Sequence, residues 1–161
     1  MSLHLQIKDN FFNEKEYNIL VNNLNKIDFA PSKNDLHFYA GCHFFKPTEE
    51  NKWVFDKVKK QFFPNIDLKA TECRFDMRHN KDKVLAHTDK SIDYIFFIYL
   101  RGKELVYNGT GFYHNKNLNT YIGFVENRAL FFNTKDNWHT DLQALGESSP
   151  RFTLNIGYNK N

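Results

Sequence analysis

The pattern of hydrophobic residues changes near residue 67, and this change constrains the fold more than any other feature of the chain. Before it, apolar residues recur at helical spacing over residues 13–27 and 48–62. After it, short β-like segments follow one another at close spacing, separated by turn residues. Helices that precede the strands, instead of alternating with them, argue against a doubly wound α/β sheet and favour an antiparallel barrel or jelly roll.

The sequence therefore predicts a mainly β protein with N-terminal helices. The first helix is expected to begin with a capping box, in which Asn13 and Glu16 exchange hydrogen bonds. The second is expected to begin at Thr48, with Glu49 and Glu50 in its first turn. The Asn108-Gly109 dipeptide is a strong signal for a tight turn. Strands are expected over residues 3–8, 68–78, 84–87, 92–100, 104–107, 111–114, 120–125, 129–133, 138–142 and 151–158.

Length and composition fit one domain, with a helical front over residues 1–66 and a jelly-roll core over 67–161. The chain has 161 residues, of which 41% are hydrophobic and 17% aromatic, so a large core is available and disorder is excluded. The longest apolar run, residues 94–100, is far shorter than the ~18 residues of a membrane-spanning helix. Residues 1–9 lack the pattern of a secretory signal. We expect a cytoplasmic protein with no membrane association.

The charge does not predict a nucleic-acid partner. The net charge is +3, but the basic residues are scattered and form no focused basic face. Lys, Asn and Phe are frequent, and their AT-rich codons explain this usage as well as a polyanionic partner would. Such usage also suits a phage or bacterial source. The sequence leaves the oligomeric state open.

Two side chains in the segment from Val84 to Asp89 carry the strongest chemical signal. His87 and Asp89 are two residues apart, so on a strand they share one face. An imidazole and a carboxylate on one face supply two ligands for a divalent metal, and His139 is the candidate for a third. Two His and one carboxylate with open positions form the facial set that holds non-haem Fe(II). The alternative pair, His139 and Asp141, has no further histidine after it.

Arg151 opens the last expected strand, on the face opposite to Phe152 and Leu154. An arginine on the polar, inward face of a sheet needs an anionic partner, and its planar guanidinium suits a carboxylate. We expect it to anchor a dicarboxylate whose other end chelates the metal. The alternative role of Arg151 is a salt bridge at the sheet edge.

The order of His87, Asp89, His139 and Arg151 resembles that of the Fe(II)- and 2-oxoglutarate-dependent dioxygenases. The segment 7–12 and the helix after it are similar to the entry segment of that superfamily, and residues 123–132 to its strand before the distal histidine. Residues 97–100, Phe-Ile-Tyr-Leu, resemble the "YLN" strand of the prolyl-hydroxylase-like branch. The resemblance covers most of the chain and implies a double-stranded β-helix, the cupin-like jelly roll.

The resemblance also implies an activity and a site. His87, Asp89 and His139 would hold Fe(II), while Arg151 and Tyr99 would hold the distal carboxylate of the co-substrate 2-oxoglutarate. Dioxygen would be consumed and succinate released as a C–H bond is hydroxylated, with ascorbate as a reductant. A peptidyl residue, proline first, is the expected substrate. A small-molecule or nucleobase oxygenase of the same superfamily is the enzymatic alternative, and a non-catalytic jelly-roll binding or viral structural module is the alternative from another class.

The chain departs from the family pattern at two places. Arg101 stands where Asn is common, and residues 109–113 replace the usual Gly-Gly-Glu-Leu stretch. The loop after Asp89 is short, so little lid material is available there. Tyr99 has a second interpretation as a core aromatic residue.

The remaining histidines and the cysteines carry weaker signals. Cys42 and Cys73 are too few for a disulfide framework and are expected to be reduced. His37 and His43 flank Cys42 and are expected to lie in a loop near the pocket mouth. A metal site there is the alternative.

Overall fold

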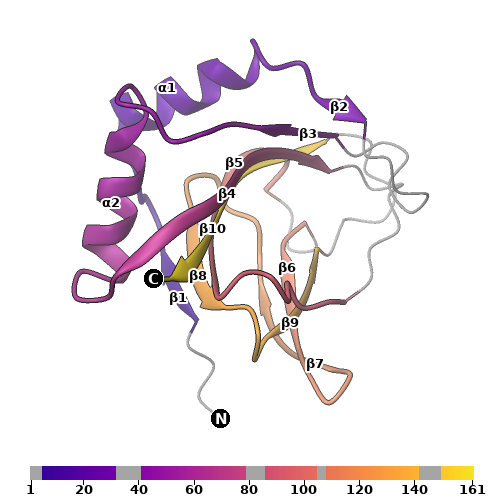
Figure 1. Cartoon of the computed structure of the whole chain (residues 1–161). Coiled ribbons are helices and arrows are strands. Elements are labelled where there is room, and N and C mark those ends of the chain that lie inside the picture. The colour runs from indigo at the N-terminus through magenta and orange to yellow at the C-terminus, as the bar shows by residue number, and fades with distance from the viewer. Residues whose placement is uncertain (1–4, 32–40, 79–85, 105–107, 142–149) are drawn as a thin grey trace.

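Two antiparallel sheets and two helices make up the computed structural model, which describes residues 5–31, 41–78, 86–104, 108–141 and 150–161. The major sheet has seven strands in the order β1-β8-β5-β10-β4-β3-β2, and the minor sheet has three in the order β7-β6-β9. Both helices lie on the same side of the major sheet, and the minor sheet lies on the other (Figure 1). The elements are β1 (Gln6–Lys8), α1 (Glu14–Leu24), β2 (Ala30–Pro31), β3 (Gly41–Phe44), α2 (Lys52–Phe62), β4 (Leu68–Arg78), β5 (Tyr94–Arg101), β6 (Thr110–His114), β7 (Asn117–Ile122), β8 (Ala129–Asn133), β9 (Trp138–Asp141) and β10 (Arg151–Lys160).

The helices begin where local hydrogen bonds allow them to begin. Asn13 and Glu16 form the predicted capping box at the start of α1. The second helix starts at Lys52 instead of Thr48, so Glu49 and Glu50 precede it, contrary to the prediction. The reason is local: the Asn51 side chain accepts a hydrogen bond from the Thr48 amide (2.7 Å) and donates one to the Lys46 carbonyl (3.0 Å). This closed turn holds the chain out of the helix.

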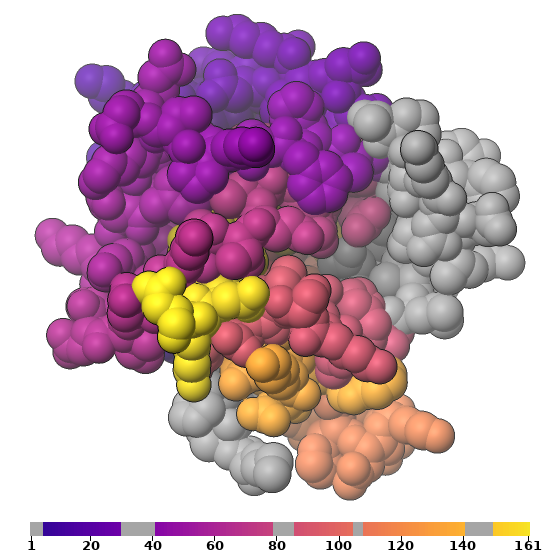
Figure 2. All heavy atoms as spheres, viewed as in Figure 1, coloured from indigo at the N-terminus to yellow at the C-terminus, as the bar shows by residue number. Residues whose placement is uncertain are grey.

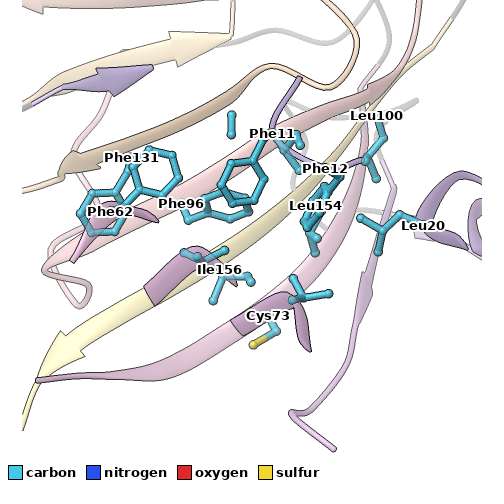
Figure 3. Packing of buried hydrophobic residues seen from close by; sticks show 14 of the residues in the cluster. Phe11, Phe12, Leu20, Phe62, Cys73, Phe96, Leu100, Phe131, Leu154 and Ile156 are labelled. Carbon is cyan, nitrogen blue, oxygen red and sulfur yellow. The ribbon is translucent and has the colours of Figure 1, made fainter. Parts of the chain in front are cut away.

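The large strands of the major sheet separate two hydrophobic cores because their side chains alternate between its faces. The first core lies between this sheet and the helices, where rings of Phe11, Phe62, Phe96 and Phe131 gather (Figure 3). Phe62 stacks on both Phe11 and Phe131, with ring centroids 5.4 Å apart in each pair. The second core lies on the opposite face of the sheet and comprises Ile92, Ile95, Phe97, Tyr99, Phe112, Phe124, Leu130 and Phe132. The space-filling view shows the helices, in indigo and purple, at one end of the molecule and the minor-sheet strands, in orange, at the other (Figure 2).

Most of the predicted strands are present, with two corrections. The hairpin between β6 and β7 turns at Asn115 and Lys116, both at positive φ (49° and 66°), and not at Asn108-Gly109. Gly109 instead packs closely against Ile122, the last residue of β7. A Cβ at this position would lie 1.9 Å from the Ile122 carbonyl oxygen, so only glycine fits there. The short strands β2 and β3 were not predicted. The expected strand at 84–87 is described only at residues 86 and 87, where His87 forms an isolated bridge, and the one at 104–107 is described only at Glu104. Within the described ranges, no helix has the length and apolar content needed to cross a membrane.

The reactivity of Cys73 reports on the packing of the first core, between the major sheet and the helices, which is called the helix-side core below. Burial, with a smaller effect of the neighbouring Glu72 carboxylate, raises the pKa of the Cys73 thiol to about 11. The thiolate is the reactive form, so Cys73 in a Cys42→Ser variant should resist Ellman's reagent at pH 8 and react only after unfolding in guanidinium. The half-buried Cys42, in a Cys73→Ser variant, provides the comparison. Equally fast labelling of Cys73 in native and unfolded protein would contradict this packing.

Candidate metal centre

Three of the predicted ligands come together at one end of the space between the sheets. His87 lies outside the named strands but forms an isolated antiparallel bridge with His139 of β9. Their backbones exchange two hydrogen bonds, of 3.0 and 2.9 Å between nitrogen and oxygen. This bridge places the two imidazole rings 4.7 Å apart between centroids. His87 and His139 are 52 residues apart in the sequence, and this backbone pairing fixes their relative position.

Asp89 completes the group. Its Oδ1 lies 4.0 Å from Nε2 of His87, and its Oδ2 lies 3.4 Å from Nε2 of His139. One potential ligand atom from each of the three residues lies within 4.8 Å of the other two. The Asp89 carbonyl oxygen accepts hydrogen bonds from the Ile92 amide and the Thr134 hydroxyl, both at 3.2 Å. Asp89 thus lies in a turn that is hydrogen-bonded to Thr134, the residue after β8.

The surroundings of His139 select the tautomer that a metal needs. Nδ1 of His139 lies 3.2 Å from the carbonyl oxygen of Asn137. A carbonyl oxygen only accepts hydrogen bonds, so Nδ1 is the donor and Nε2 keeps its lone pair on the side of Asp89. The rings of Phe132 and Phe112 flank this imidazole at 5.1 and 6.3 Å between centroids.

One oxygen of Asp89 has an environment that suits a bound cation. Oδ2 is buried and accepts no hydrogen bond from any residue that the structure describes. A buried carboxylate oxygen without a donor is costly, and a bound cation removes that cost. Two imidazole nitrogens and one carboxylate are a donor set for a divalent transition metal, with positions left for other ligands. The residues therefore fit such an ion.

The group opens into a pocket of about 60 Å³ between the sheets. One wall is apolar and comes from Ile95 and Phe97 of β5. The adjoining wall is polar and comes from alternate residues of β10 and β4, which follow β5 in the same sheet. The pocket is lined by Arg74, Asp76, Arg78, His87, Asp89, Ile95, Phe97, Thr110, His139, Thr153 and Asn155.

Asp76 is the centre of the polar wall. It is 4% exposed, and its carboxylate accepts hydrogen bonds from Nε of Arg74 (2.9 Å) and Nδ2 of Asn155 (2.8 Å). Arg74 is also paired with Glu72. Burial acts to lower the pKa of Arg74, but the carboxylates of Asp76 and Glu72, with a smaller effect of Asp89, outweigh it and raise that pKa. Arg74 is therefore a permanent cation beside the metal centre.

Arg151 and Tyr99 do not line this pocket but lie beside Thr110, which does. Arg151 is 2% exposed, and its Nη1 donates to the carbonyl oxygens of Asn108 (3.0 Å) and Gly109 (2.8 Å). Its guanidinium carbon lies 5.4 Å from the centre of the Tyr99 ring. The Tyr99 hydroxyl donates to Thr110 Oγ1 at 2.9 Å. The side chains of Arg151 and Tyr99 lie on the same face of the major sheet as the metal centre, and the alternation along β10 predicted this face for Arg151.

Sequence reasoning missed the charged wall of β4, although a signal for it was present. Cys73, Phe75 and Met77 alternate with four charged residues, and that alternation describes a strand with one charged face. The residues of the charged face are Glu72, Arg74, Asp76 and Arg78.

The weaker expectations have mixed outcomes. His43 lies on β3 opposite Phe75, exposed and away from the metal centre, so its placement in a loop at the pocket mouth was wrong. Residues 41–44 form a strand because they pair with β4, which is distant in the sequence, so local pattern did not predict it. His37 lies outside the described residues. Among the described residues, only His87, Asp89 and His139 form a group of at least three His, Cys, Asp or Glu arranged to hold a metal.

Solved structures show the same fold at low sequence identity. No protein-family model and no curated protein matches the chain. The viral collagen prolyl hydroxylase of Paramecium bursaria Chlorella virus-1 is 18% identical with a TM-score of 0.68, and the match covers 98% of this chain and 97% of that one. The prolyl hydroxylase of Trichoplax adhaerens, solved with a peptide of hypoxia inducible factor, is 15% identical with a TM-score of 0.70, covering 98% and 84%.

A further match has a different kind of bound molecule. HygX of Streptomyces hygroscopicus, solved with nickel, 2-oxoglutarate and hygromycin B, is 13% identical with a TM-score of 0.74, covering 99% of this chain and 84% of that one. Together these matches confirm the predicted jelly roll: the chain has the fold of the 2-oxoglutarate/Fe(II) oxygenases, prolyl hydroxylases included.

Proposed function

We propose that this chain is a 2-oxoglutarate- and Fe(II)-dependent oxygenase that hydroxylates a C–H bond. The observation that carries the proposal is the group formed by His87, Asp89 and His139, placed inside a jelly roll at the end of a pocket. The shared fold supports it, because HygX, which has this fold, was solved with nickel and 2-oxoglutarate bound.

The residues have separate roles in this proposal. His87, Asp89 and His139 hold the iron, and Arg151 with Tyr99 holds the distal carboxylate of 2-oxoglutarate. When bound, iron, 2-oxoglutarate and dioxygen together supply an oxidant, as 2-oxoglutarate is converted to succinate and CO₂. The Asn137 carbonyl holds His139 in the tautomer that presents Nε2.

The walls of the pocket orient the reactants and limit access of water. Ile95 and Phe97 form the apolar wall, which keeps the surroundings of the reacting C–H bond dry. Asp76 fixes the positions of Arg74 and Asn155 on the polar wall before any ligand binds. A site fixed in this way loses less conformational freedom on binding.

For the reacting substrate we propose a peptidyl residue, proline first. The "YLN"-like strand around Tyr99 and the prolyl hydroxylases among the structural matches support this choice. A small molecule is the second candidate, because HygX was solved with hygromycin B. Mass spectrometry of proline-containing peptides incubated with the protein, Fe(II) and 2-oxoglutarate decides between them. A gain of one oxygen atom on proline supports the first candidate, and unmodified peptides with 2-oxoglutarate still consumed support the second.

The test of the activity class is spectroscopic. Under anaerobic conditions, Fe(II) followed by 2-oxoglutarate should give metal-free protein a visible metal-to-ligand charge-transfer band. The band should weaken in Arg151→Ala at subsaturating 2-oxoglutarate, because the distal carboxylate loses its cationic partner.

Two comparisons make this result specific. Arg101→Ala, on the same sheet but with its guanidinium over the Phe152 ring on the helix side, should leave the band unchanged. Arg151→Lys keeps the positive charge, so it reports on the anchor if Arg151→Ala proves unstable. Absence of a band in folded wild-type protein would favour the non-catalytic binding module.

A further inference from the structure

The register of the major sheet sets two arginines directly opposite each other. Arg78, at the end of β4, pairs with Arg151, at the start of β10. Side chains at opposed positions of antiparallel strands share a face, so both belong to the inner face of the sheet. Like charges directly opposite each other are unfavourable in a sheet, unless nearby anions compensate them.

Arg78 is the member of the pair that faces the metal centre. Its side chain lines the pocket together with His87, Asp89 and His139, whereas Arg151 does not line it. Its Nη2 lies 4.0 Å from Oδ2 of Asp76. That same oxygen accepts hydrogen bonds from Arg74 and Asn155, so Asp76 forms two hydrogen bonds there and only a longer ion pair with Arg78.

The charges around the pocket identify what Arg78 can bind. Among the residues that the structure describes, the guanidinium groups of Arg74, Arg78 and Arg151 lie near the carboxylates of Glu72, Asp76 and Asp89. A bound divalent cation adds two positive charges to this group. A 2-oxo dicarboxylate brings two negative charges, which offset those of the cation in a partly buried site.

We propose that Arg78 is a second carboxylate anchor for 2-oxoglutarate, and that it binds the carboxylate next to the 2-oxo group. This inference rests on the proposed function. Arg78 shares its pocket with the metal ligands, so it takes the metal-side carboxylate, and Arg151, beside Thr110, takes the distal one. Two guanidinium groups from paired positions of β4 and β10 thereby hold both ends of one molecule. Each can form two parallel hydrogen bonds to its carboxylate.

The test compares two 2-oxo acids. Fe(II)-loaded protein is titrated anaerobically with 2-oxoglutarate and with pyruvate, which lacks the distal carboxylate, and the charge-transfer band is followed. Arg78→Gln should weaken the binding of both acids by the same factor, roughly 10- to 100-fold, as expected for loss of a charged hydrogen-bonding partner. Arg151→Lys should weaken 2-oxoglutarate binding more than pyruvate binding. Arg78→Lys should recover part of the affinity, because it keeps the charge without the paired donors.

Three controls separate the possible failures. Fe(II) affinity, measured without 2-oxo acid, should be unchanged in Arg78→Gln, and Arg101→Gln should behave as wild type. A 2-oxoglutarate affinity of Arg78→Gln within twofold of wild type overturns the inference. Weaker binding of 2-oxoglutarate alone, with pyruvate unaffected, overturns the assignment to the metal-side carboxylate. Wild-type protein that binds Fe(II) but neither acid overturns the proposed function itself.

Discussion

Asp89→Ala should abolish iron retention while leaving the fold intact. Asp89 provides the only carboxylate of the three-residue group, and its buried Oδ2 has no hydrogen-bond donor among the described residues. The loss of a ligand should exceed the ~10- to 100-fold loss of metal affinity that follows changes to groups around a ligand. Removal of this oxygen also removes a desolvation cost from the metal-free protein, so the variant should melt no earlier than metal-free wild type.

Iron analysis of protein reconstituted under anaerobic conditions measures the first effect, and circular dichroism measures the second. Asp136→Ala is the matched control, because Asp136 is an exposed aspartate in the turn just before β9. It should bind iron as wild type does. Iron content in Asp89→Ala equal to that of the control would refute the assignment of the metal centre.

Asp76→Ala should destabilise the protein by about 3 kcal/mol, since removal of one partner from a buried ion pair leaves a buried charge uncompensated. The side chain of Asp76 is 6% exposed, and its loss takes the acceptor from both Arg74 and Asn155. Asp76→Asn keeps a side chain of the same shape with one acceptor oxygen, so it should lower the free energy of unfolding by less than Asp76→Ala does. Urea denaturation followed by circular dichroism measures the change in the free energy of unfolding.

An exposed ion pair provides the comparison. Lys52 and Asp56 pair on the surface of α2 with side chains that are 57% and 60% exposed. Asp56→Ala should therefore lower the free energy of unfolding far less than Asp76→Ala does, because solvent screens an exposed pair. If Asp76→Ala cost no more than Asp56→Ala, then Asp76 would not organise the polar wall of the pocket.

The parts of the fold that local pattern determines were predicted well. Strands β4 and β8 have the predicted bounds, because each is a run of β-favouring residues ended by turn residues. The opposite faces of β10 were also predicted: Leu154 and Ile156 lie in the helix-side core, while Thr153 and Asn155 line the pocket. The spacing of His87 and Asp89 predicted two members of the metal group, and His139 was the predicted third; all three come together in the structure.

The parts that depend on long-range pairing were not predictable from local pattern. The strand β3 forms because Gly41 to Phe44 find an open edge of β4, and nothing in those four residues alone demands it. The same holds for Arg78, whose importance comes from its position opposite Arg151 and not from its neighbours in sequence. Local pattern also failed at the start of α2. The Asn51 side chain closes a turn there, and the helix begins four residues later than predicted.

The alternation along β4 and β10 has a consequence for how such a protein can change over generations. Neighbouring positions on each strand serve different purposes: Phe75 and Leu154 pack under the helices, while Asp76 and Asn155 line the pocket. Selection for a new substrate can therefore act on pocket-facing positions other than Asp76, while the residues that pack under the helices stay unchanged. A library randomised at Thr153 and at the pocket residues of β5 samples new specificities, with the helix-side core held constant throughout.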